Sequence, residues 1–231
     1  MNQAAAKLLK CTYIILALTA VISPACHVMA QEKPLYAIVI HGGAGSSPEQ
    51  MGEQGRKGRE QALERVLKMG SQLLGNGGTS LDAVEQVIRA MEDDPIFNAG
   101  RGAVFNSAGG HELDASIMDG KTLLAGAVGG VTVIKNPIRA AHAVMEKTPH
   151  VMLAGDGADT FAKKVGLETV PRKYFYTEHR WKQLEEWKAK QKTKKQSQLE
   201  MTREYLGTVG CAALDSKGNI AAGTSTGGLT G

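Results

Sequence analysis

A threonine near the end of the chain has the clearest chemical potential. Thr208 lies in the run Gly207-Thr208-Val209-Gly210. A threonine hydroxyl inside a chain is a poor nucleophile, but cleavage of the Gly207–Thr208 bond would give Thr208 a free α-amine. The unperturbed pKa of such an amine is roughly 7.7–8.0, so near neutral pH it can accept the proton of the hydroxyl. The junction therefore predicts a nucleophile and its base in one residue.

The surroundings of this junction favour the chemistry over an ordinary Gly-Thr pair at the start of a strand. A polar, lysine-rich segment precedes Gly207, and an apolar strand follows it. Glycine also tolerates the strained backbone in which the Thr208 hydroxyl can attack the preceding carbonyl. In a hairpin, the hydroxyls of Thr224-Ser225-Thr226-Gly227-Gly228 could approach Thr208 and relay its proton. We therefore hypothesise an amidohydrolase that activates itself by cutting its own backbone.

Two glycine-rich segments add candidate functions, each beside a simpler alternative. The run His41-Gly42-Gly43-Ala44-Gly45 could donate backbone N–H groups to an oxyanion, or it could be a glycine-rich turn. We interpret His41 as a histidine packed at a strand end and not as a general base. The loop Asp94–Gly102 could direct carbonyl oxygens around a hard cation, or it could be a plain bend. Neither a zinc-type ligand spacing nor a P-loop is present.

These segments must be positioned by alternating strands and helices, so the pattern indicates a mixed α and β class. Thr79, with Asp82 three residues later, predicts the start of a helix whose stripe includes Ala83, Val87 and Met91. Pro137 is placed as the first residue of another helix. The predicted strands are 35–40, 112–119, 124–134, 150–154 and the hairpin 208–214 with 220–226. The predicted helices are 56–74, one that opens at Thr79 and stops before Pro95, 137–147 and 156–165, and the segment 177–203 is helical by propensity.

The first thirty residues predict a signal peptide. Lys7 and Lys10 precede an apolar run, Cys11–Ile22, that is too short for a membrane span, and Val28-Met29-Ala30 suits a cleavage site. An uncleaved anchor and a lipoprotein signal ending at Cys26 are the alternatives. We expect an exported protein, periplasmic or secreted, that has no membrane attachment after signal removal. Mature Cys211 would then be alone, and we interpret it as a small buried thiol rather than a nucleophile.

The net charge of +4 does not indicate a nucleic-acid partner. Between His179 and Arg203 there are eight Lys or Arg against three Asp or Glu, so the basicity belongs to one segment. Residues 188–198 are almost wholly Lys, Gln, Thr and Ser, a composition that cannot bury a face and predicts an exposed, mobile tail over 188–203. We expect no nucleic-acid binding.

Several long motifs together resemble the plant-type L-asparaginase or isoaspartyl peptidase family of N-terminal-nucleophile hydrolases. The resemblance runs from about Tyr36 to Gly231. The motifs that carry it are IVIHGGAG (38–45), DDPIFNAGRGAVFN (93–106), HELDASIMDG (111–120), GAVGGV (126–131), NPIRAA (136–141) and GTVGCAALDSKGNIAAGTSTGG (207–228). Their shared order makes a chance match untenable.

The resemblance implies a four-layer αββα sandwich of the α+β class and a precursor that cleaves itself before Thr208. Residues 31–207 would form the α-subunit part and 208–231 the start of the β subunit. It implies hydrolysis of L-asparagine and of β-aspartyl dipeptides, no cofactor, and a homodimer of αβ units. Thr208 would be the nucleophile and Thr226 its assistant. The remaining implied residues are Gly42, Asn98 and Gly228, which would position or stabilise the site, and Phe97, Ala99 and Arg101, whose carbonyls would bind a structural sodium ion.

The chain departs from this family at its end. Members continue for roughly another hundred residues, which supply an Arg, an Asp and a Thr-Gly pair for substrate binding. We therefore expect a sandwich incomplete at the C-terminus, in a fragment of a longer protein. The alternatives are a glycosylasparaginase-like amidase, an inactive truncated remnant, and a lysine-rich interaction module.

Overall fold

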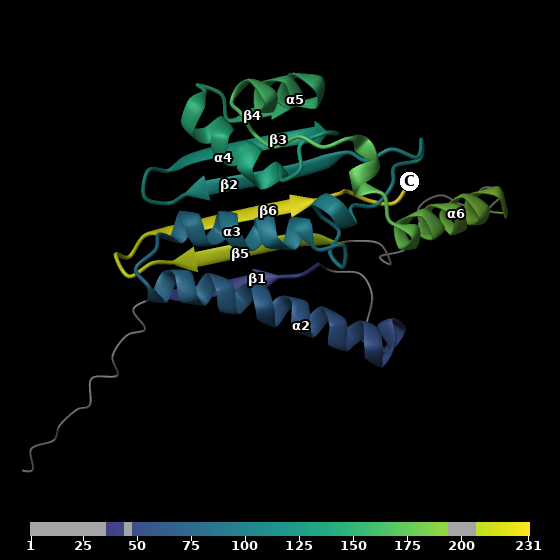
Figure 1. Cartoon of the computed structure of the whole chain (residues 1–231), viewed down its shortest axis with the longest axis horizontal. Helices are drawn as coiled ribbons and strands as arrows, with labels where there is room; N and C mark the ends of the chain where they lie inside the picture. The colour runs from purple at the N-terminus through teal and green to yellow at the C-terminus, as the bar shows by residue number, and fades with distance from the viewer. Residues whose placement is uncertain (1–35, 44–47, 194–206) are drawn as a thin grey trace, which may run out of the picture. The chain divides into compact units, whose positions relative to one another are not determined.

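A computed structural model describes residues 36–43, 48–193 and 207–231, which form one six-stranded sheet with helices packed on it (Figure 1). The strands lie in the order β1-β5-β6-β2-β3-β4, and all neighbours are antiparallel except β3 and β4. The strands are β1 (Ala37–His41), β2 (Leu113–Asp119), β3 (Leu124–Val131), β4 (Met152–Ala154), β5 (Thr208–Leu214) and β6 (Ile220–Thr226). The helices are α2 (Pro48–Gly75), α3 (Ser80–Asp93), α4 (Pro137–Lys147), α5 (Gly155–Lys164) and α6 (Glu178–Thr193), with short 3-10 turns η1 (Gly100–Gly102) and η2 (Arg172–Phe175).

The predicted elements are confirmed, with differences at their ends. The β5–β6 hairpin and α4 have the predicted bounds. Helix α2 starts earlier than expected, at Pro48, and contains a non-helical break at Gly52, where φ is 66°. Strand β4 is shorter than predicted, because only three residues pair with β3. The predicted signal peptide and residues 194–203 of the predicted tail lie outside the described residues; residues 188–193 continue α6.

One face of the sheet is covered by a layer of helices. Helix α2 packs beside β1, α3 crosses β5 and β6, and α4 crosses β2 and β3 (Figure 1). The predicted cap is confirmed, because the Asp82 backbone N–H donates to Thr79 Oγ1 at 3.1 Å. In the hairpin turn, Asp215 accepts from the Ser80 backbone N–H at 3.2 Å. This bond connects the turn of the β5–β6 hairpin to the positive end of α3. It helps to fix where the hairpin packs against the helix layer.

The opposite face of the sheet is apolar and open in the part of the chain that the structure describes. Alternate residues of β2, β5 and β6 are buried against the helices, while the residues between them point away. On this second face Val39, Met118 and Ile220 are 66%, 43% and 58% exposed. They border or flank a shallow hollow of about 550 Å³ that runs over the central strands. The described residues therefore form two layers, one of helices and one of sheet.

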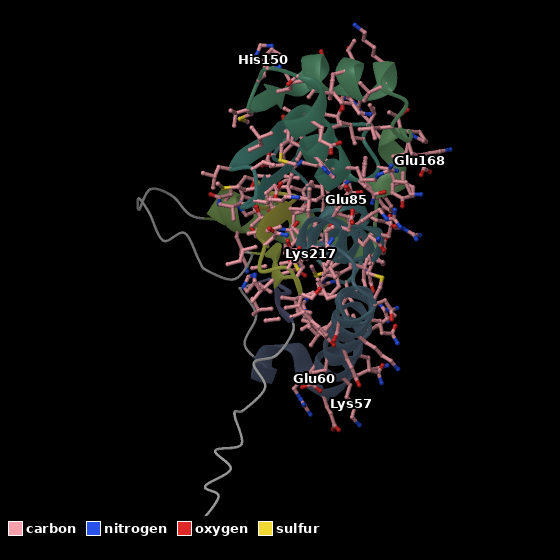
Figure 2. All side chains as sticks on the ribbon, turned by 90° about the vertical axis from the view of Figure 1, so that its left-hand side faces the viewer. Lys57, Glu60, Glu85, His150, Glu168 and Lys217 are labelled. Atoms are coloured by element: carbon pink, nitrogen blue, oxygen red, sulfur yellow. The ribbon has the colours of Figure 1, made fainter. Side chains whose placement is uncertain are left out.

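Charged side chains lie on the outer surface of the helix layer. Figure 2 shows Lys57 and Glu60 of α2 near one end of this layer and His150 before β4 near the other. Ion pairs here, such as the exposed pair Arg56–Glu60 at 2.7 Å, contribute at most about 1 kcal/mol each to folding. The layers are therefore held together by buried apolar side chains. None of the helices in the described ranges is long and apolar enough to cross a membrane.

Candidate active site

The predicted junction lies at the start of an inner strand. Gly207 precedes β5, which pairs with β1 on one side and β6 on the other. In the β5–β6 register, Thr208 is directly opposite Thr226, and both are half-buried. The hairpin therefore brings together the predicted nucleophile and the predicted assisting hydroxyl from residues eighteen positions apart.

Thr226 is also in contact with the carbonyl that self-cleavage would attack. Its hydroxyl lies in donor geometry 3.4 Å from the Gly207 carbonyl oxygen and accepts from the Gly228 backbone N–H at 3.0 Å. When a hydroxyl attacks a peptide carbonyl, the carbonyl oxygen takes negative charge, and a hydrogen-bond donor already at that oxygen stabilises it. Thr226 is placed to act as such a donor.

The three hydroxyls of the run 224–226 do not share one environment, because strand residues alternate between the faces of a sheet and because Thr224 is opposite Gly210 while Thr226 is opposite Thr208. Thr224 lies on the open face, where its hydroxyl is 3.1 Å from that of Ser116. Ser225 is buried on the helix side. Of the three, Thr226 contacts Gly207. The sequence predicted that this run would approach Thr208, but only the strand register distinguished its members.

Asn98 connects the 94–102 loop to the end of β6. Its side-chain amide donates to the Gly228 carbonyl at 2.8 Å, its side-chain oxygen accepts from the Val104 N–H at 3.0 Å, and its own carbonyl accepts from the Gly227 N–H at 3.1 Å. A Cβ on Gly207 would lie 2.8 Å from Asn98 Cβ, so the two residues are in tight contact. Asn98 and Gly228 therefore lie beside the junction.

The glycine-rich segment after β1 approaches the same junction from the other side. Gly43 has a φ of 110°, and a Cβ there would lie 3.3 Å from Gly207 Cα. Gly42 instead packs against Leu63 and Phe97, where a Cβ would come within 2.8 and 3.2 Å of their side chains. The interpretation of His41 as a packed histidine is wrong: it is exposed, with Nδ1 2.8 Å from the Thr208 carbonyl oxygen. Ala44 and Gly45 lie outside the described residues.

The carbonyls predicted to bind a cation lie in a tight bend around Gly102. A Cβ on Gly102 would lie 2.0 Å from the Phe97 oxygen and 2.6 Å from the Pro95 oxygen, so both carbonyl oxygens pack closely against Gly102. The Ala99 carbonyl already accepts from the Gly102 N–H at 3.1 Å. Backbone carbonyl oxygens are the ligand type that a hard cation requires, which is why the loop stays a candidate for such an ion. Within the described ranges, no His, Cys, Asp and Glu side chains cluster as a metal site.

A buried glutamate beside the site was not singled out from the sequence. Glu92, in the last turn of α3, is fully buried; its Oε1 accepts from the Ser225 hydroxyl at 2.7 Å and the Ile138 N–H at 3.0 Å. Burial raises its pKa to about 8, although the hydrogen bonds from Ser225 and Ile138 favour the charged form. The sequence did carry a signal for this burial, because Glu92 follows the apolar Ile88 by four residues. That spacing places both side chains on the buried stripe of α3.

Glu92 predicts a pH dependence of stability. The ordinary pKa of its carboxyl is 4.5, and the folded value is about 8. Between these values the folded state keeps a proton that the unfolded chain releases, so the free energy of unfolding falls as pH rises. The stabilisation is complete below pH 4.5 and is lost through pH 8, by about 1.4 kcal/mol per pH unit from this group. Urea unfolding at pH 5 to 8 should show this slope in the wild type and a shallower one in Glu92→Gln. Parallel slopes for the two proteins would contradict the prediction.

The prediction for Cys211 as a small buried thiol is confirmed. It is 5% exposed, and burial raises its pKa to about 12. Because the thiolate is the reactive form, we expect Cys211 to react with a disulfide reagent at pH 8 at least ~10²-fold more slowly in the folded protein than in urea. Peptide mass mapping of the modified site would measure both rates, and equal rates would contradict the buried assignment.

The chain belongs to the asparaginase family, because the family model described as Asparaginase matches residues 34–231. It is 48% identical over 193 residues to the isoaspartyl peptidase/L-asparaginase of Homo sapiens, covering 83% of this chain and 60% of that protein. It is 45% identical over 197 residues to the isoaspartyl peptidase of Escherichia coli (strain K12), covering 84% of this chain and 61% of that one. The chain thus spans about three fifths of the length of these relatives.

Proposed function

We propose that this chain is part of an amidohydrolase that acts on L-asparagine and β-aspartyl dipeptides after cleavage between Gly207 and Thr208. The observation that carries the proposal is the contact of the Thr226 hydroxyl with the Gly207 carbonyl, opposite Thr208 in the same hairpin. Membership in the asparaginase family and the names of the two relatives support the substrate class.

The proposed activation begins with attack of Thr208 Oγ on the Gly207 carbonyl carbon. The C–N bond breaks, the acyl group moves to the hydroxyl as an ester, and water then hydrolyses this ester and frees Thr208 as an N-terminus. In the active form the new α-amine accepts the hydroxyl proton while Oγ attacks the side-chain amide carbon of the substrate. Ammonia or the amine of the peptide leaves, and water releases aspartate from Thr208.

The proposal is tested by intact mass over time on the purified chain and on any longer product of its reading frame. Splitting between Gly207 and Thr208, followed by release of aspartate from asparagine and from a β-aspartyl dipeptide, is the expected result. A protein that splits but prefers a glycoasparagine is the glycosylasparaginase-like alternative. If no product splits, the chain is an inactive remnant and the proposed function is wrong.

A variant of Thr226 tests the observation that carries the proposal. We expect Thr226→Val to slow splitting by about 10²-fold, the usual loss when one donor to an oxyanion is removed. Thr224→Val is the matched control, because it removes a hydroxyl from the same strand that contacts Ser116 instead of Gly207. Time courses by mass spectrometry measure both. Equal rates for the two variants would exclude the role assigned to Thr226.

We further propose that the open sheet face is covered by a second sheet, giving the four-layer αββα sandwich. An apolar face of this size costs free energy when it is left in water, and sheet faces commonly pack on each other at about 10 Å. The wider expectations are also proposals: export after signal removal, a homodimer of αβ units, no cofactor, and a structural sodium ion on the carbonyls of Phe97, Ala99 and Arg101. Replacing Na⁺ by a larger cation and measuring the midpoint of thermal unfolding would test the ion.

A further inference from the structure

Glu92 connects three elements in the interior of the protein. Its carboxylate oxygen Oε1 receives the Ser225 hydroxyl of β6 and the Ile138 N–H at the start of α4, while Glu92 itself belongs to α3. Its second oxygen, Oε2, is buried with no hydrogen-bond partner among the described residues. An oxygen of this kind fits a carboxyl that carries a proton, which agrees with the raised pKa of the group.

Two of the three segments that lie against Gly207 also contact Glu92. In β6, Ser225 directly precedes Thr226, whose hydroxyl contacts the Gly207 carbonyl. In the 94–102 loop, Gly100 packs so closely that a Cβ there would lie 2.4 Å from the Glu92 carbonyl oxygen and 2.7 Å from its Cβ. The same loop carries Asn98, which packs on Gly207. Glu92 is therefore a shared support for β6 and the 94–102 loop, two of the segments beside the junction.

The bond to Ser225 also favours the register of β6 that is observed, with Ser225 on the helix side. Side chains alternate along a strand, so a slip of one residue would move Thr226 to the helix side and Ser225 toward Thr208. A serine hydroxyl buried under the helices needs a partner, since an unpaired one costs about 1–3 kcal/mol. Glu92 supplies that partner only when Ser225 is on the helix side, and this arrangement places Thr226 opposite Thr208.

We propose that Glu92 is a positioning residue for cleavage of the Gly207–Thr208 bond, acting through Ser225 to hold the Thr226 hydroxyl at the Gly207 carbonyl. This inference rests on the proposed function. Glu92 does not touch the reacting atoms. Its role requires a hydrogen-bond acceptor at the position of Oε1 and does not require a negative charge.

The test compares variants that keep or remove this acceptor. Glu92→Gln keeps a neutral oxygen in the place of Oε1, while Glu92→Met has similar size and no oxygen acceptor, only a weakly accepting sulfur. Asp159→Leu is the matched control. Asp159 is also buried, and it accepts from the hydroxyl of Thr132 at 2.9 Å and from the backbone N–H of Thr132 at 3.1 Å. It differs from Glu92 because it lies on α5. Splitting is followed by intact mass well below each unfolding midpoint, and hydrogen exchange of the peptide 221–231 is measured on the same samples.

We expect Glu92→Gln to split within about 3-fold of the wild-type rate, and Glu92→Met to split at least ~10-fold more slowly, with faster exchange in 221–231. Asp159→Leu should lose stability without slowing the splitting of folded protein. In protein that has split, kcat for a β-aspartyl dipeptide should fall in Glu92→Met while KM stays near the wild-type value. If Glu92→Met does not fold, Ser225→Ala takes its place with the same expectation.

Three outcomes overturn the inference. The first is splitting at the wild-type rate by folded Glu92→Met, or by Ser225→Ala where that variant replaces it. The second is equal slowing in Glu92→Gln and Glu92→Met, because a kept acceptor would then make no difference. The third is equal slowing in Asp159→Leu, which would assign the effect to stability alone. A wild type that does not split at all instead refutes the proposed function, and the inference falls with it.

Discussion

Thr208→Ala should leave the protein whole and without hydrolytic activity. The change removes the hydroxyl that we propose attacks the Gly207 carbonyl, and neither water nor a neighbouring group should replace a nucleophile held beside its target. We expect the rates of splitting and of asparagine hydrolysis to fall by at least ~10³-fold. Intact mass detects the splitting, and release of ammonia or aspartate detects the hydrolysis.

Thr208→Ser is the matched control for this prediction, because it keeps a hydroxyl and loses only the methyl group. It should still split, at a rate reduced by the additional rotamer freedom of serine. Thr208 is half-buried at the start of β5, so neither variant should change the unfolding midpoint greatly. Continued splitting of Thr208→Ala at Gly207 would show that the hydroxyl is not the nucleophile and that another group, or a contaminating protease, cuts the chain.

Gly126→Ala should cause the largest loss of stability among single-methyl additions on the sheet. Gly126 is a buried residue of β3 directly under α4. A Cβ there would lie 2.1 Å from the Ala141 carbonyl oxygen and 2.6 Å from the Met145 nitrogen, both backbone atoms of α4. Because neither atom can move alone, the helix must shift away from the sheet. We expect a loss of ~3 kcal/mol or more, or a fall of about 6–12 °C in the unfolding midpoint.

Gly157→Ala is the control for this second prediction. Gly157 lies in α5, and a Cβ there would meet no atom within 4 Å. In a helix this exchange should be neutral or stabilising by about 0.5–1 kcal/mol, because alanine loses less backbone entropy on folding. Thermal unfolding of the three proteins by circular dichroism compares them directly. A Gly126→Ala midpoint within about 2 °C of the wild type would show that α4 accommodates the methyl group at little cost.

The elements that carry the site could be predicted from the sequence because their signals are local. Turn residues, caps and alternation depend on neighbours in the chain, and so they located the β5–β6 hairpin and the start of α3 at Thr79. The start of α2 at Pro48 was missed, because the break at Gly52 interrupts the helical pattern that a sequence shows. The environment of His41 was also missed, since exposure at a strand end depends on what packs there.

The sequence by itself determined the order of the elements, the candidate nucleophile Thr208 and the run of hydroxyls from which its proposed assistant comes. Only the tertiary structure decided that Thr226 contacts Gly207 while Ser225 faces the helices, because the strand register selects the face of each residue. It also decided that Glu92 is buried between α3, α4 and β6. The physical reason is that hydrogen-bond pairing and burial join residues over a hundred positions apart, and no local pattern encodes such contacts.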